Sequence, residues 1–329
     1  MNNNFYSFDS EYNFEKKVKA FNNVRSHGNI VGIGVLCFVA LSNTIALILS
    51  LFGVDEFIKS SEILLECFDI IFSIAAIFLP FLFVMFKVRK NHNDDSFGFN
   101  KPYDKKMFLY AISGGLMLCL FADKIAGIIV YMMSGFGMTV ESVQSTKPTS
   151  VSGFLLYLVS SAVVAPLIEE FAIRGVTLQP LRKYGDKFAI VISSLVFGLM
   201  HQNFVQALFA FITGLVIGYF AVSTGSVWCG VIIHSLNNFF AVITNSVSDN
   251  SPYITVYFVY TILPLLIYIL GIISLIIYLK EKNRYKLMKP QVQCISTKEK
   301  TKAFLLSGTM LAAMIIMILK TISYVSITG

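Results

Sequence analysis

Long apolar runs separated by short polar stretches dominate the pattern of the chain. Nine such runs lie at residues 30–53, 66–87, 107–133, 152–178, 187–202, 204–222, 226–246, 253–279 and 303–325. A helix of about 20 apolar residues crosses the hydrocarbon core of a bilayer, which is roughly 30 Å thick. The runs are continuous rather than alternating, which argues against a transmembrane β-barrel. The pattern therefore predicts an all-α fold, a polytopic transmembrane helix bundle with about eight or nine spans.

The composition also points to a membrane protein. Of the 329 residues, 56% are hydrophobic and 14% are charged, whereas about a quarter of the residues of a soluble domain are charged. The segment from Met1 to Gly28 is polar and mixed in charge, so we expect no cleavable signal peptide. The net charge of +7 would suit a nucleic-acid-binding protein if the chain were soluble. Here we expect a multi-pass protein of the cell membrane that contacts lipid and no nucleic acid.

The basic residues predict the orientation of the bundle. Lysines and arginines gather in the N-terminal tail, after the second run, between the fourth and fifth runs, and at residues 280–302. The opposite loops, around residues 54–62, 134–150 and 247–252, hold just Lys59 and Lys147. Because basic loops stay in the cytoplasm, this asymmetry predicts a cytoplasmic N-terminus.

On this basis the chain divides into four parts. They are a cytoplasmic N-terminal tail (1–29), N-terminal transmembrane spans (30–151), a helical core that holds the candidate chemistry (152–246), and C-terminal spans with a basic cytoplasmic loop at 280–302 (247–329).

The fourth apolar run contains three charges in the sequence PLIEEFAIRG. Glu170 and Arg174 are four residues apart, on one face of a helix, with the glutamate on the N-terminal side that favours a pair. Glu169 is rotated by about 100° from that face and has no local counter-charge. Charges are costly at membrane depth and mark functional sites. We therefore predict Glu169 as a general acid or base, supported by the Glu170–Arg174 pair.

Two histidines lie in the same part of the chain. Phe197 and His201 are four residues apart at the end of the fifth run, so the ring is expected to wall one side of the imidazole. His234 and Asn238 share a face of the seventh run, while Asn237 is expected to point elsewhere. A histidine and an amide on one face can donate two hydrogen bonds to a developing oxyanion.

Depth along each helix tests whether these groups can meet. At 1.5 Å per residue, Glu169 lies roughly 15 Å from its cytoplasmic end, His234 roughly 12 Å and His201 roughly 20 Å. The larger value for His201 predicts that the fifth run is short, tilted or turned back inside the bundle. Asp123 and Lys124, in the third run, are adjacent and are not expected to face each other. We expect them to pair with neighbouring helices, with a role in substrate access as the alternative.

The three pairs together resemble a known family. Glu169-Glu170-x-x-x-Arg174, Phe197-x-x-x-His201 and His234-x-x-x-Asn238 occur in that order on three runs, and the set is similar to the CPBP family of CAAX proteases and bacteriocin-processing enzymes, also called the Abi family. The resemblance covers about residues 152–246.

The resemblance implies an intramembrane endopeptidase. It implies that Glu169 and His201 activate the attacking water and that His234 and Asn238 stabilise the tetrahedral intermediate, with Glu170, Arg174 and Phe197 in support. The chain departs from the family at Ile173, where an aromatic residue commonly precedes the arginine.

Two mechanisms and two other classes of function stay open. A metal-free, glutamate-dependent mechanism is favoured. A zinc ion held by Glu169, His201 and His234 is the alternative. An ion-coupled transporter would also need membrane carboxylates, but the chain shows no internal repeat. A non-proteolytic immunity or scaffold protein is the last alternative. As substrate we expect a membrane-associated peptide or protein, such as a peptide pheromone, a bacteriocin leader or a signalling protein.

Overall fold

The computed structural model describes residues 3–92, 97–140, 148–247, 251–281 and 287–327, and these are mostly helical. The α-helices are α1 (Asn3–Leu51), α2 (Val54–Lys59), α3 (Glu62–Ser73), α4 (Leu79–His92), α5 (Lys105–Gly135), α6 (Val151–Val159), α7 (Ala165–Glu170), α8 (Gln179–Leu181), α9 (Asp186–Met200), α10 (Phe204–Thr224), α11 (Val227–Ser246), α12 (Tyr253–Tyr257), α13 (Leu263–Lys280), α14 (Thr297–Leu305) and α15 (Gly308–Ile322).

Tighter and wider turns interrupt these helices, and one small sheet joins two distant segments. The π-helical segments are η1 (Ile74–Phe78), η2 (Ser160–Val164), η3 (Phe171–Leu178) and η5 (Phe258–Ile262), and η4 (Arg182–Tyr184) is a 3₁₀ turn. The strands β1 (Met138–Val140) and β2 (Val325–Ile327) pair antiparallel, with Thr139 opposite Ser326.

The prediction of a polytopic helical membrane protein is confirmed. Within the described residues, seven helices are long and apolar enough to cross a membrane: Tyr12–Leu51, Glu62–Lys90, Lys105–Gly135, Val151–Tyr184, Phe204–Thr224, Val227–Ser246 and Tyr253–Lys280. The last predicted run corresponds to α14 and α15, which are bent by 76° against each other and would make an eighth span if counted as one.

The predicted fifth span is the exception. Residues 187–202 form α9, a helix of 15 residues that is too short to cross a bilayer. A tight turn at His201, Gln202 and Asn203 leads directly into α10, which packs back against α9. Of the three explanations for the depth of His201, α9 is therefore both short and turned back inside the bundle.

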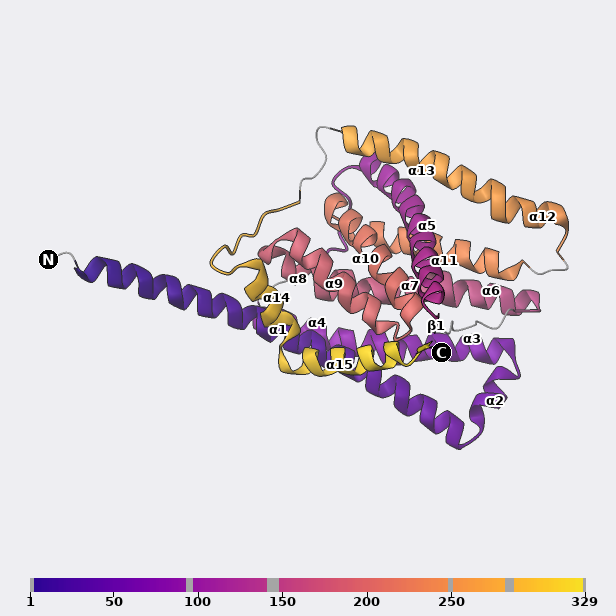
Figure 1. The fold of residues 1–329 in the computed structure, drawn as a ribbon, viewed down its shortest axis with the longest axis horizontal. Helices are drawn as coiled ribbons and strands as arrows, with labels where there is room; N and C mark the ends of the chain where they lie inside the picture. Colours follow the sequence, from indigo (N-terminus) through magenta and orange to yellow (C-terminus); the bar gives the residue numbers. More distant parts are fainter. Residues whose placement is uncertain (1–2, 93–96, 141–147, 248–250, 282–286, 328–329) are drawn as a thin grey trace.

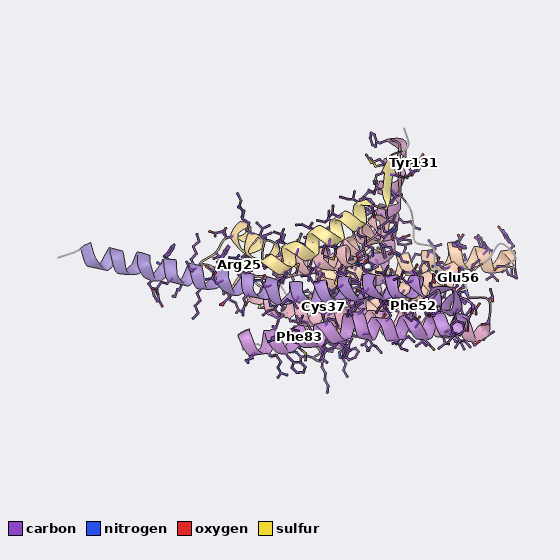
Figure 2. The ribbon with its side chains drawn as sticks, turned by 90° about the horizontal axis from the view of Figure 1, so that it is seen from below. Arg25, Cys37, Phe52, Glu56, Phe83 and Tyr131 are labelled. Atoms are coloured by element: carbon purple, nitrogen blue, oxygen red, sulfur yellow. The ribbon has the colours of Figure 1, made fainter. Side chains whose placement is uncertain are left out.

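The helices that carry the candidate residues lie at the centre of the bundle (Figure 1). The continuous stretch α6–η2–α7–η3 contacts α11 on one side and α9 on another. Helix α5 packs against α10 and α11, and α13 packs against α5, whereas α1 packs against α4, α14 and α15. Figure 2 follows α1 through Arg25 and Cys37 to Phe52, the residue just after its end, and shows Tyr131 near the end of α5 standing away from the other labelled residues.

Small residues permit the closest helix packing. A Cβ atom added at Gly214 of α10 would lie 3.1 Å from the Cβ atom of Ser194 in α9, and one added at Gly218 would lie 3.2 Å from Ile190. Glycines four residues apart let helix backbones approach in this way. The α9–α10 contact therefore depends on the spacing noted in the sequence.

The basic segments lie together at one end of the bundle. Lys17 of α1 pairs with Glu299 of α14 at 2.6 Å, and the backbone N–H of Gln291 donates to the carbonyl of Lys183 at 3.0 Å. Helix α1 runs without a break through residues 29 and 30, where the predicted tail ends. The polar tail residue His27 is buried at 2% exposure, and its Nε2 donates to the carbonyl of Thr177. This histidine is therefore packed inside the bundle, although it lies in the polar N-terminal segment.

Candidate active site

The two glutamates lie where α7 ends and the π-helix η3 begins. Glu170 is the last residue of α7, and its side chain is fully buried. Its Oε1 accepts from Nη1 of Arg174 at 3.0 Å, which is the i,i+4 pair expected from the sequence. The guanidinium is also fully buried, donates through Nη2 to the carbonyl of Gly214 at 3.2 Å, and lies 4.6 Å from the ring centre of Phe197. The pair thus joins η3 to α9 and α10.

Glu169 faces a different direction. Its side chain keeps 21% of its surface exposed, and its Oε2 lies 3.8 Å from Nε2 of His234. Arg174 pairs with Glu170 instead. The carboxylate without a guanidinium partner is therefore the one that opens into a cavity.

His201 is held by the end of α9. Its Nδ1 lies 2.9 Å from the carbonyl of Phe197 and donates to it, so the neutral ring presents the Nε2 lone pair away from the helix. The next residue, Gln202, has φ 53°. Among the described residues other than glycine, it alone has a left-handed backbone. Asn203 then caps α10 by accepting from the backbone N–H of Gln206 at 3.2 Å. This turn ends α9 at the depth of the glutamates.

The ring of Phe197 contacts both histidines and the guanidinium of Arg174. It meets the ring of His201 edge to face, with 5.0 Å between centroids and 89° between planes. It meets His234 in a similar arrangement at 5.7 Å and 80°, while Arg174 stacks over it. The ring therefore orients both imidazoles and the guanidinium, a larger role than the one-sided wall expected from its spacing to His201.

Helix α11 supplies His234, whose ring is fixed by the buried pair. Its Nδ1 donates to Oε1 of Glu170 at 3.0 Å, the same oxygen that Arg174 contacts. The other nitrogen, Nε2, faces Glu169. Because Nδ1 holds a proton, Nε2 accepts in the neutral ring and donates when the ring is protonated.

A glycine one turn earlier in α11 makes room for this contact. A Cβ atom added at Gly230 would lie 2.9 Å from Oε2 of Glu170.

Asn238 has a structural contact that its spacing did not indicate. Its Nδ2 donates to the carbonyl of Ser161 at 2.9 Å. In the π-helix η2 this carbonyl would pair with the N–H five residues on, but that residue is Pro166, which has none. The carbonyl that Pro166 leaves unpaired thus accepts from a side chain of α11, and the second amide N–H of Asn238 is left for other partners.

These residues surround one cavity of about 220 Å³. Its lining residues are Glu169, Phe197, His201, Gln206, Phe209, Ala210, Thr213, Ile217, His234, Asn237 and Asn238. The structure therefore brings together the four predicted catalytic residues around a shared space, although their chemical roles remain predictions. Asn237 was expected to point elsewhere but lines the same cavity and donates to Oδ1 of Asn238 at 3.4 Å. Gln206 and Thr213 carry no charge or motif and were missed in the sequence.

A second cavity, of about 240 Å³, adjoins the first. The two share four lining residues, which are Glu169, Phe197, His201 and Gln206. The rest of the second cavity is apolar and is lined by Phe38, Phe72, Ile77, Ala172, Ile173 and Met200.

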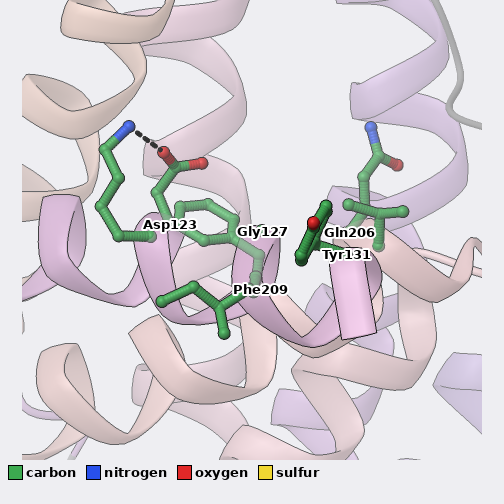
Figure 3. A pocket seen from close by; sticks show the side chains of 9 residues that line it. Asp123, Gly127, Tyr131, Gln206 and Phe209 are labelled. Carbon is green, nitrogen blue, oxygen red and sulfur yellow. Dashed lines mark hydrogen bonds and ion pairs between the residues drawn. The ribbon is translucent and has the colours of Figure 1, made fainter. Parts of the chain in front are cut away.

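A third hollow, of about 590 Å³, lies between α5 and the start of α10 (Figure 3). Asp123, Lys124 and Tyr131 line it from α5, and Gln206 and Phe209 from α10, so it meets the catalytic cavity at these last two residues. Lys124 Nζ contacts Asp123 Oδ2 at 3.1 Å, and both side chains are exposed. The expectation that these neighbours do not face each other is wrong, because their flexible side chains bend together outside the helix.

The possible zinc ligands do not form a compact set. Glu169, His201 and His234 line one cavity, but within the described part of the chain no three histidine, cysteine or acidic side chains converge closely enough to hold a metal ion. Hydrogen bonds do fix both Nδ1 atoms, as is common around zinc. The same bonds equally suit imidazoles that act on water directly.

The matches to known proteins cover the part of the chain that holds the candidate site. Residues 151–240 match the family model for type II CAAX prenyl endopeptidase Rce1-like proteins. A protein of Bacillus subtilis (strain 168), "Putative membrane peptidase YdiL", is 29% identical over 155 residues, which are 47% of this chain and 60% of that protein. The chain thus covers less than two thirds of that relative's length. No solved structure gives a significant match to the chain.

These matches confirm the resemblance to the CPBP family and the multi-pass membrane character of the protein. Both matches carry the names of peptidases, one a CAAX prenyl endopeptidase and the other a membrane peptidase.

Proposed function

We propose that the protein is an intramembrane endopeptidase that hydrolyses a peptide bond in a membrane-associated peptide or protein. The observation that carries this proposal is the cavity shared by Glu169, His201 and His234, three groups with proton-transfer chemistry from three different helices. Glu170 is already engaged by Arg174 and His234, which leaves Glu169 available for the reaction.

In the proposed mechanism Glu169 accepts a proton from a water that the Nε2 lone pair of His201 orients. The water oxygen forms a bond to the carbonyl carbon of the substrate, and the carbonyl oxygen becomes an oxyanion. His234, when protonated, donates to this oxygen through Nε2, and the second amide N–H of Asn238 can do the same. Glu169 then passes its proton to the leaving nitrogen as the carbon–nitrogen bond breaks. The mechanism needs no metal, although zinc held by Glu169, His201 and His234 is the alternative.

The proposal is tested by the change Glu169→Gln in purified, full-length protein reconstituted in lipid vesicles. The amide keeps the shape of the side chain and removes the base, so we expect a fall in cleavage of model membrane peptides of about 10²–10⁴-fold. The melting temperature should stay near that of the wild type, because Glu169 is partly exposed and pairs with no guanidinium.

Cleavage that persists in Glu169→Gln would show that another group is the base. Absence of any cleavage by the wild-type protein, together with coupled ion flux or specific binding of a partner, would instead favour the transporter or the scaffold. Substrates of interest include bacteriocin leaders, peptide pheromones and prenylated peptides, and the last of these tests CAAX processing directly.

A further inference from the structure

The apolar cavity beside the catalytic cavity has no part in the proposed chemistry. It contacts the reacting groups through Glu169 and His201, and the remaining lining is almost entirely aliphatic or aromatic. We infer that this cavity is a substrate subsite, which holds a large apolar side chain directly next to the bond that is cut. This inference rests on the proposed function and adds the class of residue that the enzyme selects.

Size and chemistry together define the occupant. A closed apolar cavity of about 150 Å³ holds a benzene molecule, so a space of about 240 Å³ admits the side chain of leucine, methionine or phenylalanine. A charged side chain would have few partners there, since the polar residues of the lining are the two catalytic groups and Gln206. Burying an unpaired charge is strongly unfavourable, so acidic and basic residues are excluded.

The walls of this subsite come from two regions of the chain. Ala172 and Ile173 of η3 and Met200 of α9 belong to the stretch that matches the family model. The opposite wall consists of Phe38 of α1, Phe72 of α3 and Ile77 of η1, which lie outside it.

The N-terminal helices reach the catalytic core through aromatic contacts. Phe78 of η1 lies 5.2 Å from Phe171 of η3, measured between ring centroids. The N-terminal helices therefore contribute to substrate choice as well as to the bundle.

Gln206 lies where this subsite, the catalytic cavity and the hollow between α5 and α10 meet, since it lines all three. Its backbone N–H donates to the capping oxygen Oδ1 of Asn203, and its side-chain amide makes no hydrogen bond to a described residue. A primary amide offers one acceptor and two donors, which match the polar groups of a peptide backbone. A substrate backbone held there would place one side chain in the subsite, with the carbonyl carbon near the water held by Glu169 and the carbonyl oxygen toward His234.

The experiment measures residue preference in a set of internally quenched peptides. Each peptide has an apolar segment flanked by lysines, and the two residues that flank one central bond vary among alanine, valine, leucine, phenylalanine, tryptophan and aspartate. Full-length enzyme in detergent is incubated with the set, and mass spectrometry locates each cut. Leucine or phenylalanine on one side of the bond should exceed alanine by about tenfold or more in kcat/KM, the range typical of hydrophobic pockets.

Two variants should move this preference in opposite directions. Ile173→Phe fills part of the cavity and should favour alanine or valine, whereas Phe72→Ala enlarges it and should favour tryptophan. Phe68→Ala is the matched control, because Phe68 lies one turn before Phe72, stacks on it at 6.0 Å and does not line the cavity. Cleavage that depends on Glu169 but keeps one preference in both variants would overturn the subsite and leave the proposed function intact.

If these variants fail to fold, a binding measurement tests the subsite instead. Glu169→Gln protein is mixed with a cleavable peptide that carries photo-leucine at the preferred position, and the cross-linked residues are mapped. Label on Phe72, Ile77 or Met200 supports the subsite, whereas label on Ile128 or Tyr131 of the α5–α10 hollow overturns it. If the wild-type enzyme cuts no peptide in a manner that depends on Glu169, the proposed function fails and the subsite falls with it. Cleavage restricted to peptides with a prenyl group on the flanking residue would also overturn the assignment.

Discussion

Removal of the Glu170 carboxylate should destabilise the protein more than any change to its catalytic neighbour. In Glu170→Ala, the fully buried Arg174 loses its ion-pair partner, which costs about 3–5 kcal/mol. His234 Nδ1 loses its acceptor as well, which costs about 1–3 kcal/mol in isolation. These contributions share one carboxylate oxygen and are not additive. We expect Glu170→Ala to lower the free energy of unfolding by about 4 kcal/mol in total and the apparent melting temperature by on the order of 10 °C.

The double variant separates the charge from the hydrogen bond. Glu170→Gln combined with Arg174→Met removes both buried charges and keeps an oxygen that can accept from His234. Replacement of a buried ion pair by groups of similar volume is often neutral, so the double variant should recover at least about half of the lost stability. The single change Glu170→Gln should lie between the two, because it leaves the guanidinium charge uncompensated.

The measurement is the loss of helical circular dichroism on heating in detergent, with all variants at one protein concentration. Asp55→Ala is the matched control, since Asp55 also forms an i,i+4 pair, with Lys59 at 3.3 Å, but both side chains have solvent-exposed surface. Its effect should stay within about 0.5 kcal/mol. A double variant no more stable than Glu170→Ala, or a control that melts equally early, would refute the assignment of the stability to this pair.

Three further predictions concern the turn, the glycine and the metal. Gln202→Gly should raise the melting temperature, since a left-handed backbone costs about 1–2 kcal/mol for a residue with a Cβ atom, whereas Gln202→Val should lower it; equal melting of the two variants would contradict this. Gly230→Ala should lower both stability and activity because its Cβ atom would press on Glu170, although alanine alone favours a helix by about 0.5–1 kcal/mol, so a gain in stability would argue against this contact. Activity should survive strong chelators, and His234→Asn should retain a trace of activity that His201→Asn lacks. Equal loss in both histidine variants, with activity restored to chelated enzyme by zinc, would establish the metal mechanism.

The elements that were predicted well depend on local sequence. The sixth and seventh predicted spans, 204–222 and 226–246, differ from α10 (Phe204–Thr224) and α11 (Val227–Ser246) by two residues or fewer at either end. Hydropathy over about 20 residues decides such a span, because each residue contributes its own transfer free energy. The Glu170–Arg174 contact is equally local, since helix geometry places residues four apart side by side.

Contacts between distant segments could not be predicted in this way. The fifth run has the hydropathy of a span, and its reversal depends on one left-handed residue, Gln202, and on the packing of α9 against α10. Asn238 is hydrogen-bonded to Ser161, which lies 77 positions earlier in the chain. Phe38 and Phe72 line the apolar cavity beside the catalytic one, although their helices lie outside the family match. None of these residues has a sequence neighbour that would reveal its partner.

The sequence by itself therefore determined that the protein is a helical membrane protein and which polar residues are candidates for its chemistry. Apolar burial and helix periodicity are properties of short stretches, and a charge in an apolar run is visible without any fold. The tertiary structure decided that Glu170 also holds His234, and which side chains wall the space beside Glu169. These outcomes depend on how whole helices pack, and packing is set by contacts between residues far apart in the chain.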